Sequence, residues 1–293
     1  MSSRGDAGLE HTARLLIACP DRSGIVAAVT GFLYNHGANI TSLHEYSTER
    51  TGGRFFMRVE FTTPNLDLSG EALEDAFGRV LGERYEMDWR VSFARHRKRT
   101  VILASKQDHA LLELLWRHKR GELHADITAV ISNHRTCEAA VREMGIPFHH
   151  VPSVKGDKAA SEAKLIELLG DDTELVVLAR YMQILTEGFV QRFPNRIINI
   201  HHSFLPAFVG ARPYHQAHDR GVKLIGATAH YVTAELDAGP IIEQDVTRVS
   251  HKHDAAQLVR MGRNIEREVL ARAVTWHLED RVLVHGNTTV VFD

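Results

Sequence analysis

The segment Asn199-Ile200-His201-His202-Ser203-Phe204-Leu205-Pro206 decides both the fold and the site. It follows Arg196-Ile197-Ile198, a short apolar run typical of a buried parallel strand. Side chains alternate between the two faces of a strand, so Asn199 and His201 are predicted to point the same way. Because open α/β sheets bind ligands beyond the carboxyl ends of their strands, this strand end predicts a ligand site.

An amide beside an imidazole suits acyl chemistry. Asn199 can donate a hydrogen bond to a carbonyl oxygen that becomes an anion, and a charged His201 can stabilise the same oxygen. Asp237, in Asp237-Ala238-Gly239-Pro240, would orient the imidazole if the chain folds back onto His201. Taken singly, each residue has an ordinary alternative, namely a structural histidine, an asparagine that caps a turn and an aspartate within one. Together they predict an acyl-transfer site without a nucleophilic serine or cysteine.

Composition excludes several other classes. The chain has 293 residues, of which 44% are hydrophobic and 25% charged, which is typical of a globular protein with room for two domains. The net charge of −2 gives no general attraction to nucleic acid or to an anionic membrane. Met1–His11 has no apolar signal core, and Cys19 and Cys137 fall in different predicted domains. We therefore expect a cytoplasmic protein without a membrane segment.

Nineteen histidines raise the question of a metal site. The clusters His149-His150, His201-His202 and His251-Lys252-His253 lack the cysteine or carboxylate partners of a zinc site. We expect no bound metal.

Residues 12–95 are predicted to form one small α/β domain of the ferredoxin-like βαββαβ type. The second of its helices should carry Leu73, Phe77, Val80 and Leu81 on one buried face. The expected strands are Arg14–Ala18, Ile40–Thr48, Arg54–Thr62 and Met87–Phe93, with the first helix around Ile25–Leu33.

A basic linker over residues 96–99 precedes a second domain over residues 100–293. There, apolar runs alternate with helical segments, which predicts a doubly wound, mostly parallel sheet. Leu112, Leu115 and Trp116 have helical spacing and are predicted to pack in its core. The expected strands are Val101–Ala104, Ile127–Ile131, Leu175–Leu178, Ile197–Ile200, Leu224–Val232 and Ile241–Val249, and the expected helices are Ala110–Lys119, Thr136–Met144, Ala159–Leu169 and Ala255–His277.

Both halves resemble known families. Cys19–Val26, with Gly37-Ala38-Asn39-Ile40 after the helix, resembles the start of an ACT regulatory domain, and Thr100 onward resembles the formyltransferase fold. The order of the two domains and the motif at 199–208 resemble the formyltetrahydrofolate deformylase family over residues 12–293. Residue by residue, the resemblance implies that Asn199, His201 and Asp237 are catalytic. It also implies a cis peptide bond at Leu205-Pro206.

The resemblance further implies that Tyr181-Met182-Gln183-Ile184-Leu185 lines the pterin pocket, with core packing as the alternative for Met182, Ile184 and Leu185. His202, next to the site, could contact substrate or only its own loop. One departure from related transferases concerns the loop after the first strand, Ala104–His109, which has no glycine. Close backbone approach to a phosphate favours glycine, so this loop favours water over a phosphorylated amine as the acceptor.

The implied reaction is hydrolysis of 10-formyltetrahydrofolate to tetrahydrofolate and formate, which supplies formate to purine and one-carbon metabolism. Folate is then the substrate, and no cofactor is expected. Two alternatives remain open, a formyltransferase that uses an amine acceptor and a non-catalytic amino-acid sensor. The residue that acts as the general base is also left open.

ACT domains commonly bind amino acids where two copies pair, which implies a homo-oligomer. The candidate effector residues are Asp21, Arg22, Gly24 and Asn39, with methionine or glycine as the effector. Asp21 could instead only cap the helix that follows it.

Overall fold

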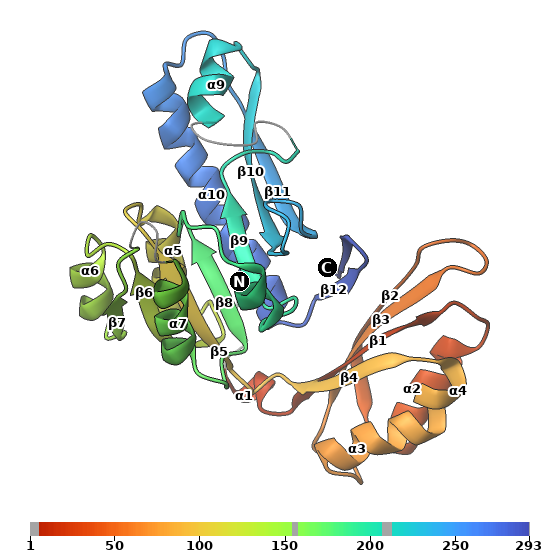
Figure 1. Cartoon of the computed structure of the whole chain (residues 1–293). Coiled ribbons are helices and arrows are strands. Elements are labelled where there is room, and N and C mark those ends of the chain that lie inside the picture. The colour runs from red at the N-terminus through yellow and green to blue at the C-terminus, as the bar shows by residue number, and fades with distance from the viewer. Residues whose placement is uncertain (1–5, 154–157, 207–212, 293) are drawn as a thin grey trace. The chain divides into compact units, whose positions relative to one another are not determined.

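The computed structural model describes residues 6–153, 158–206 and 213–292 (Figure 1). Within these residues the chain forms two compact units. The first contains the residues up to Arg97 together with Glu279–His285 and those from Val290 onward, and the second contains Lys98–Leu278 and Gly286–Thr289. Residues 279–293 were predicted to belong to the second domain, but Glu279–His285 and the residues from Val290 onward belong to the first unit.

The first unit has the predicted βαββαβ order, and its four strands form an antiparallel sheet in the order β2-β3-β1-β4. A short helix, α1 (Asp6–Leu9), precedes it. The elements are β1 (Thr12–Pro20), α2 (Ile25–Asn35), β2 (Asn39–Ser47), β3 (Arg54–Thr62), α3 (Gly70–Phe77), the π-helix η1 (Gly78–Gly82), α4 (Glu83–Tyr85) and β4 (Asp88–Phe93).

The second helical segment differs from the prediction in one respect. Leu73, Phe77 and Leu81 are buried as expected, but Val80 is 55% exposed. Gly78–Gly82 winds as a π-helix, which uses more residues per turn than the regular α-helix that the prediction assumed. The winding keeps Leu81 in the core and turns Val80 toward solvent.

Asp280 ties the segment after Leu278 to the sheet of the first unit. Its carboxylate lies 3.7 Å from Arg14 Nη1 and 2.7 Å from Arg90 Nη2, and it accepts a hydrogen bond from Ser92 Oγ at 2.7 Å. Arg58 Nε donates to the Asp280 carbonyl oxygen at 3.0 Å. Arg14, Arg58 and Asp280 are all buried. Removing any one of these charges would therefore leave a buried charge without its full compensation.

The second unit contains a seven-stranded sheet in the order β11-β10-β9-β8-β5-β6-β7. β5 to β9 pair in parallel, and β10 runs antiparallel to β9 and β11, which confirms the mostly parallel sheet. The strands are β5 (Lys98–Ala104), β6 (Ala125–Ser132), β7 (Phe148–His150), β8 (Leu175–Ala179), β9 (Ile197–His201), β10 (Leu224–Tyr231) and β11 (Ile241–Arg248). Lys98 and Arg99, assigned to the linker by sequence, begin β5. A hairpin of β12 (Val282–His285) and β13 (Thr288–Val291) follows.

Helices cover both faces of this sheet (Figure 1). Leu165 and Leu169 of α7 and Phe189 of α8 pack into one apolar cluster with β5, β8 and β9. α10 packs along β9 and β10 and beside α5 on the other face. No helix within the described residues is long and apolar enough to cross a membrane. The helices are α5 (His109–Lys119), α6 (Glu138–Glu143), α7 (Lys158–Leu169), α8 (Glu187–Gln191), α9 (Pro213–Asp219) and α10 (Ala255–Leu278).

The prediction that Trp116 is a core residue is wrong. α5 buries Leu111, Leu114 and Leu115, while Trp116 is 49% exposed. The next residue along a helix is turned by about a quarter of a revolution, which carries Trp116 off the buried stripe. The Arg120 guanidinium stacks over its ring, 4.6 Å from the centroid.

Two glycines of the first unit give a matched test of its packing. A Cβ at Gly82 would lie 2.5 Å from Cζ3 of Trp89, whereas a Cβ at Gly31 of α2 would meet nothing within 4 Å. We expect Gly82→Ala to lower the free energy of unfolding by about 1–3 kcal/mol through overpacking. Gly31→Ala should raise it by about 0.5–1 kcal/mol through helix propensity. Urea unfolding followed by circular dichroism measures both, and equal effects would contradict the packing described here.

Candidate active site

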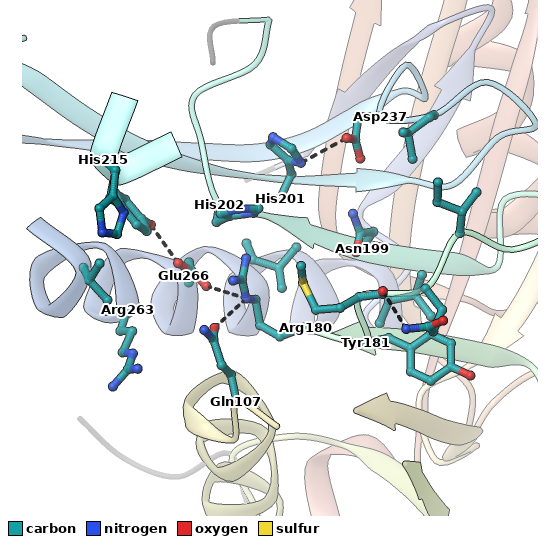
Figure 2. A pocket seen from close by; sticks show the side chains of 18 residues that line it. Gln107, Arg180, Tyr181, Asn199, His201, His202, His215, Asp237, Arg263 and Glu266 are labelled. Atoms are coloured by element: carbon teal, nitrogen blue, oxygen red, sulfur yellow. Dashed lines mark hydrogen bonds and ion pairs between the residues drawn. The ribbon is translucent and has the colours of Figure 1, made fainter. Parts of the chain in front are cut away.

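The pairing of β9 with β10 builds the first part of the site. Asn199 and His201 lie two residues apart on β9 and project to the same side, as predicted (Figure 2). Across the antiparallel pair, Asn199 is opposite His230 and His201 is opposite Thr228. Asn199 is therefore a strand residue and does not cap a turn. Leu205-Pro206, shortly after β9, is a cis peptide bond, as the resemblance implied.

Asp237 folds back onto His201, which is the condition for its carboxylate to orient the imidazole. Its Oδ2 lies 3.2 Å from His201 Nδ1. Asp237 has a left-handed φ of 55°, and a Cβ at Gly239 would lie 1.9 Å from the Tyr231 carbonyl oxygen, so the turn requires glycine there. The hydrogen bond with His201, together with the nearby imidazole of His230, holds the pKa of Asp237 well below its ordinary value. The carboxylate is consequently charged at neutral pH and orients the imidazole.

The other nitrogen of His201 has no hydrogen-bond partner among the described residues. His201 is buried, lines the cavity described below, and its Nε2 makes no hydrogen bond to any described residue. A structural histidine would be expected to use both nitrogens inside the protein. An oriented imidazole with one free nitrogen at a cavity wall is the arrangement expected of a group that acts on a ligand.

His230, which the sequence did not single out, contacts two of the candidate catalytic residues. It is 2% exposed, and its Nδ1 lies 2.9 Å from the Tyr231 carbonyl oxygen, which requires a hydrogen on Nδ1. Its Nε2 lies 3.2 Å from Asn199 Nδ2 and 3.7 Å from Asp237 Oδ1. His230 thereby holds Asn199 and Asp237 in place. It lies in β10, whose residues are buried at every position after the first, so no alternation in the sequence distinguishes it from a core residue.

A cavity of about 530 Å³ opens beside these residues (Figure 2). Asn199, His201 and Asp237 line it together with Tyr181, Met182, Gln183 and Ile184, and Leu185 lines two adjoining pockets. Met182 and Ile184 are 59% and 61% exposed, so they are not core residues. Tyr181 is buried, and burial raises its pKa to about 12. The segment predicted to line a pocket therefore does so.

Glu162 fastens the end of this segment. Its carboxylate accepts hydrogen bonds from the backbone N–H of Thr186, at 2.7 Å, and from the Thr186 hydroxyl. Thr186 in turn caps α8 by accepting from Phe189 N–H. The loop after β8 is thus held at both ends, by the sheet and by α7.

His202 lies in the same cavity, between the catalytic candidates and a polar cluster on α10 (Figure 2). Burial, assisted by the charge of Arg180, lowers the pKa of His202 to about 4. His202 is therefore neutral at physiological pH. Its ring meets Tyr214 edge-on, with 6.3 Å between centroids.

The loop between β5 and α5 is short and contains no glycine. Lys106 in it is exposed, and Gln107 reaches the cavity. Among the described residues, no group of three or more histidine, cysteine, aspartate or glutamate side chains is arranged to hold a metal ion.

The four candidate effector residues lie in the first unit. Asp21 accepts a hydrogen bond from Ser47 Oγ at 2.9 Å, and Gly24 with φ 92° is the N-cap of α2 without a side-chain cap, so Asp21 does not cap that helix. Arg22 pairs with Glu86 at 2.6 Å, and Asn39 begins β2 on an exposed position.

Comparisons with known proteins agree with this architecture. Residues 98–274 match the formyl transferase family and residues 13–78 match the ACT domain. A formyltetrahydrofolate deformylase of Bacillus subtilis is 53% identical, covering 98% of this chain and 95% of that protein. Crystal structures of formyltetrahydrofolate deformylases from Pseudomonas syringae pv. tomato and Burkholderia mallei match with TM-scores of 0.93 and 0.90 at 51% and 45% identity. They cover 97% of this chain, and 95% and 100% of those chains.

The fold and the site thus define an enzyme of the formyl transferase class that carries an ACT domain. Within that class, the proteins that match almost the whole chain are formyltetrahydrofolate deformylases, and these matches decide the family. The chain belongs to the formyltetrahydrofolate deformylase family.

The protonation state of His202 can be tested directly. We expect its imidazole to stay neutral from pH 8 down to pH 5, because charging it would place a cation in a buried site beside Arg180. Nitrogen-15 NMR of the histidine rings measures this, with His202→Gln used to assign the resonance. A titration midpoint near the ordinary value of about 6.5 would show that the ring is solvated instead.

Proposed function

We propose that this protein hydrolyses 10-formyltetrahydrofolate to tetrahydrofolate and formate. The observation that carries the proposal is buried His201, which Asp237 holds at a wall of the cavity that Asn199 also lines, and whose Nε2 makes no hydrogen bond to any described residue. An acyl oxygen placed there would meet an amide donor and an imidazole together.

In the proposed reaction, the oxygen of a water molecule attacks the formyl carbon and forms a new C–O bond, while the carbonyl electron pair moves to the formyl oxygen. Asn199 donates to this oxyanion, and the protonated form of His201 stabilises it electrostatically. Collapse of the intermediate breaks the C–N bond. One proton from the water ends on the folate nitrogen, and the other leaves when formic acid ionises to formate. Asp237 positions the water and supports the imidazolium.

Water is favoured over an amine acceptor for two reasons. The loop after β5 has no glycine with which a backbone cradle could approach a phosphorylated amine closely. The relatives that match almost the whole chain are named deformylases, which does not favour the transferase alternative. The non-catalytic sensor is not favoured by them either.

We also propose that the reaction needs no resident cofactor. The amide, the imidazole and the carboxylate already supply a donor to the oxyanion, a counter-charge and an orienting anion. Activity that survives extensive dialysis against a chelator supports this part of the proposal, and loss that returns with added metal contradicts it.

The catalytic assignment predicts that Asn199→Ala, His201→Ala and Asp237→Asn each lose at least about 10²-fold in turnover, because each removes support from the developing oxyanion. Release of formate from 10-formyltetrahydrofolate without an amine acceptor measures the loss. His251→Ala is the matched control, since His251 lies in an exposed turn. Near-native turnover in any of the three variants would remove that residue from the mechanism, and fast release only after adding an amine would favour a transferase.

The first unit is proposed to bind an amino-acid effector, with methionine or glycine as the candidates, between paired copies of a homo-oligomer. Support comes from the ACT match over residues 13–78 and from the polar groups of Asp21, Arg22 and Asn39 beside Gly24. Arg22→Ala should abolish the response of formate release to the effector while leaving basal release unchanged. Arg50→Ala, at an exposed arginine of the turn between β2 and β3, is the control.

The effector assay uses a panel of amino acids, with calorimetry to detect binding and light scattering to measure the oligomer. If no amino acid binds or changes the rate, this part of the proposal is wrong. The proposed hydrolysis is tested separately, by the formate-release assay.

A further inference from the structure

A second polar cluster belongs to the same cavity as Asn199 and His201 (Figure 2). We call it the Arg180 cluster; its members are Gln107, His109, Arg180, Tyr214 and Glu266. All but His109 line the cavity, and His109 contacts Glu266. The mechanism proposed above uses none of them.

Glu266 is the buried anion of the cluster. It is 1% exposed, accepts a hydrogen bond from the Tyr214 hydroxyl at 2.7 Å, and lies 2.9 Å from His109 Nε2 and 3.4 Å from Arg180 Nε. Burial opposes its charge, but His109 and Arg180 hold the pKa of Glu266 below its ordinary value. A Cβ at Gly262, one turn earlier on α10, would lie 2.1 Å from the Tyr214 ring, so glycine admits that tyrosine.

Arg180 presents a free edge to the cavity. Its Nε is 3.0 Å from Gln107 Oε1 and 3.4 Å from Glu266, while Nη1 and Nη2 make no hydrogen bond within the part of the chain that the structure describes. The residue is 6% exposed, and its φ of 62° is one that a non-glycine residue rarely adopts. Because Arg180 lines the cavity, these donors are available to the acceptors of a ligand.

The chemistry of this edge selects a carboxylate. The two Nη groups of a guanidinium donate in parallel and match the two oxygens of a carboxylate. Stability alone explains the cluster poorly, because a buried ion pair is often no better than an apolar replacement. A guanidinium that is held in place through Nε, with both Nη groups unpaired among the described residues, is better explained by an anionic ligand.

The proposed reaction creates such a ligand inside this cavity, since a neutral formyl group becomes a carboxylate. We propose that the free edge of Arg180 binds the formate ion released by hydrolysis, so that the Arg180 cluster is a product subsite. This inference rests on the proposed function. Formate drawn to Arg180 leaves Asn199 and His201, which frees their donors for the next substrate.

Folate substrates also carry the carboxylates of a glutamate tail, which offer the same chemistry. The burial of Arg180 and of Glu266 beside it favours the smaller ion. The two sources differ in a measurable way, because only a tail contact is lost when the substrate lacks its glutamate.

The test uses the full chain and sodium formate. Calorimetry measures formate binding without turnover, and formate inhibition of hydrolysis measures it during turnover. Arg180→Lys keeps a positive charge beside Glu266 but loses the paired donors, and we expect formate binding to weaken by about tenfold or more with little change in KM. Arg267→Gln, at a half-buried arginine of α10 that bonds Asn264 and does not line the cavity, should leave binding and activity unchanged.

If Arg180→Lys does not fold by circular dichroism, Arg180→Gln combined with Glu266→Gln removes both buried charges and should also lose formate binding. Unchanged formate affinity in the folded variant would overturn the inference, as would the absence of formate binding to the native chain. A KM increase that disappears with 10-formyltetrahydropteroate, alongside unchanged formate affinity, would assign Arg180 to the tail instead. Formate binding that depends on Arg180 in a chain without hydrolytic activity would defeat the proposed function alone.

Discussion

The antiparallel pairing of β10 with β9 is the constraint on which the site depends. It sets His230 opposite Asn199, so that an imidazole nitrogen lies 3.2 Å from the amide nitrogen of that asparagine. A slip of one residue would move every side chain of β10 to the other face of the sheet. The turn that follows β10 then returns Asp237 to His201, and this return needs the left-handed backbone of Asp237 and the missing side chain of Gly239.

The opposite wall depends on the loop after β8. Arg180 and Met182 both have positive φ angles, and Glu162 fixes the end of the loop through Thr186. Backbone strain of this kind persists when the surrounding contacts over-determine the conformation. Here the strain turns Arg180 toward Glu266 and leaves Met182 and Ile184 exposed at the cavity.

Local patterns were enough to predict most of the fold. Alternation and apolar runs predicted β9 and the two residues it projects, because strand geometry alone determines which side chains share a face. Resemblance was needed for Asp237, since a turn sequence does not say what the turn contacts. The sequence did not predict that His230 and Glu266 belong to the site. Their hydrogen-bond partners lie on other elements, far away in the sequence, so no local pattern identifies them. Val80 was wrongly predicted to be buried because the helix changes to π-helical winding at Gly78–Gly82. Trp116 was wrongly predicted to be buried because the apolar stripe of α5 is narrower than the prediction assumed.

The contacts of Asp280 also affect how the chain is assembled. Arg14 and Arg58, on β1 and β3, are buried with a carboxylate and a carbonyl of Asp280, which the ribosome adds only after Lys98–Leu278 of the second unit. Domains usually fold in the order in which they are synthesised. In the nascent first unit Arg14 and Arg58 share the carboxylate of Glu60 on β3, and they gain Asp280 after Lys98–Leu278 has been made, so the part of the protein that is made first is completed last.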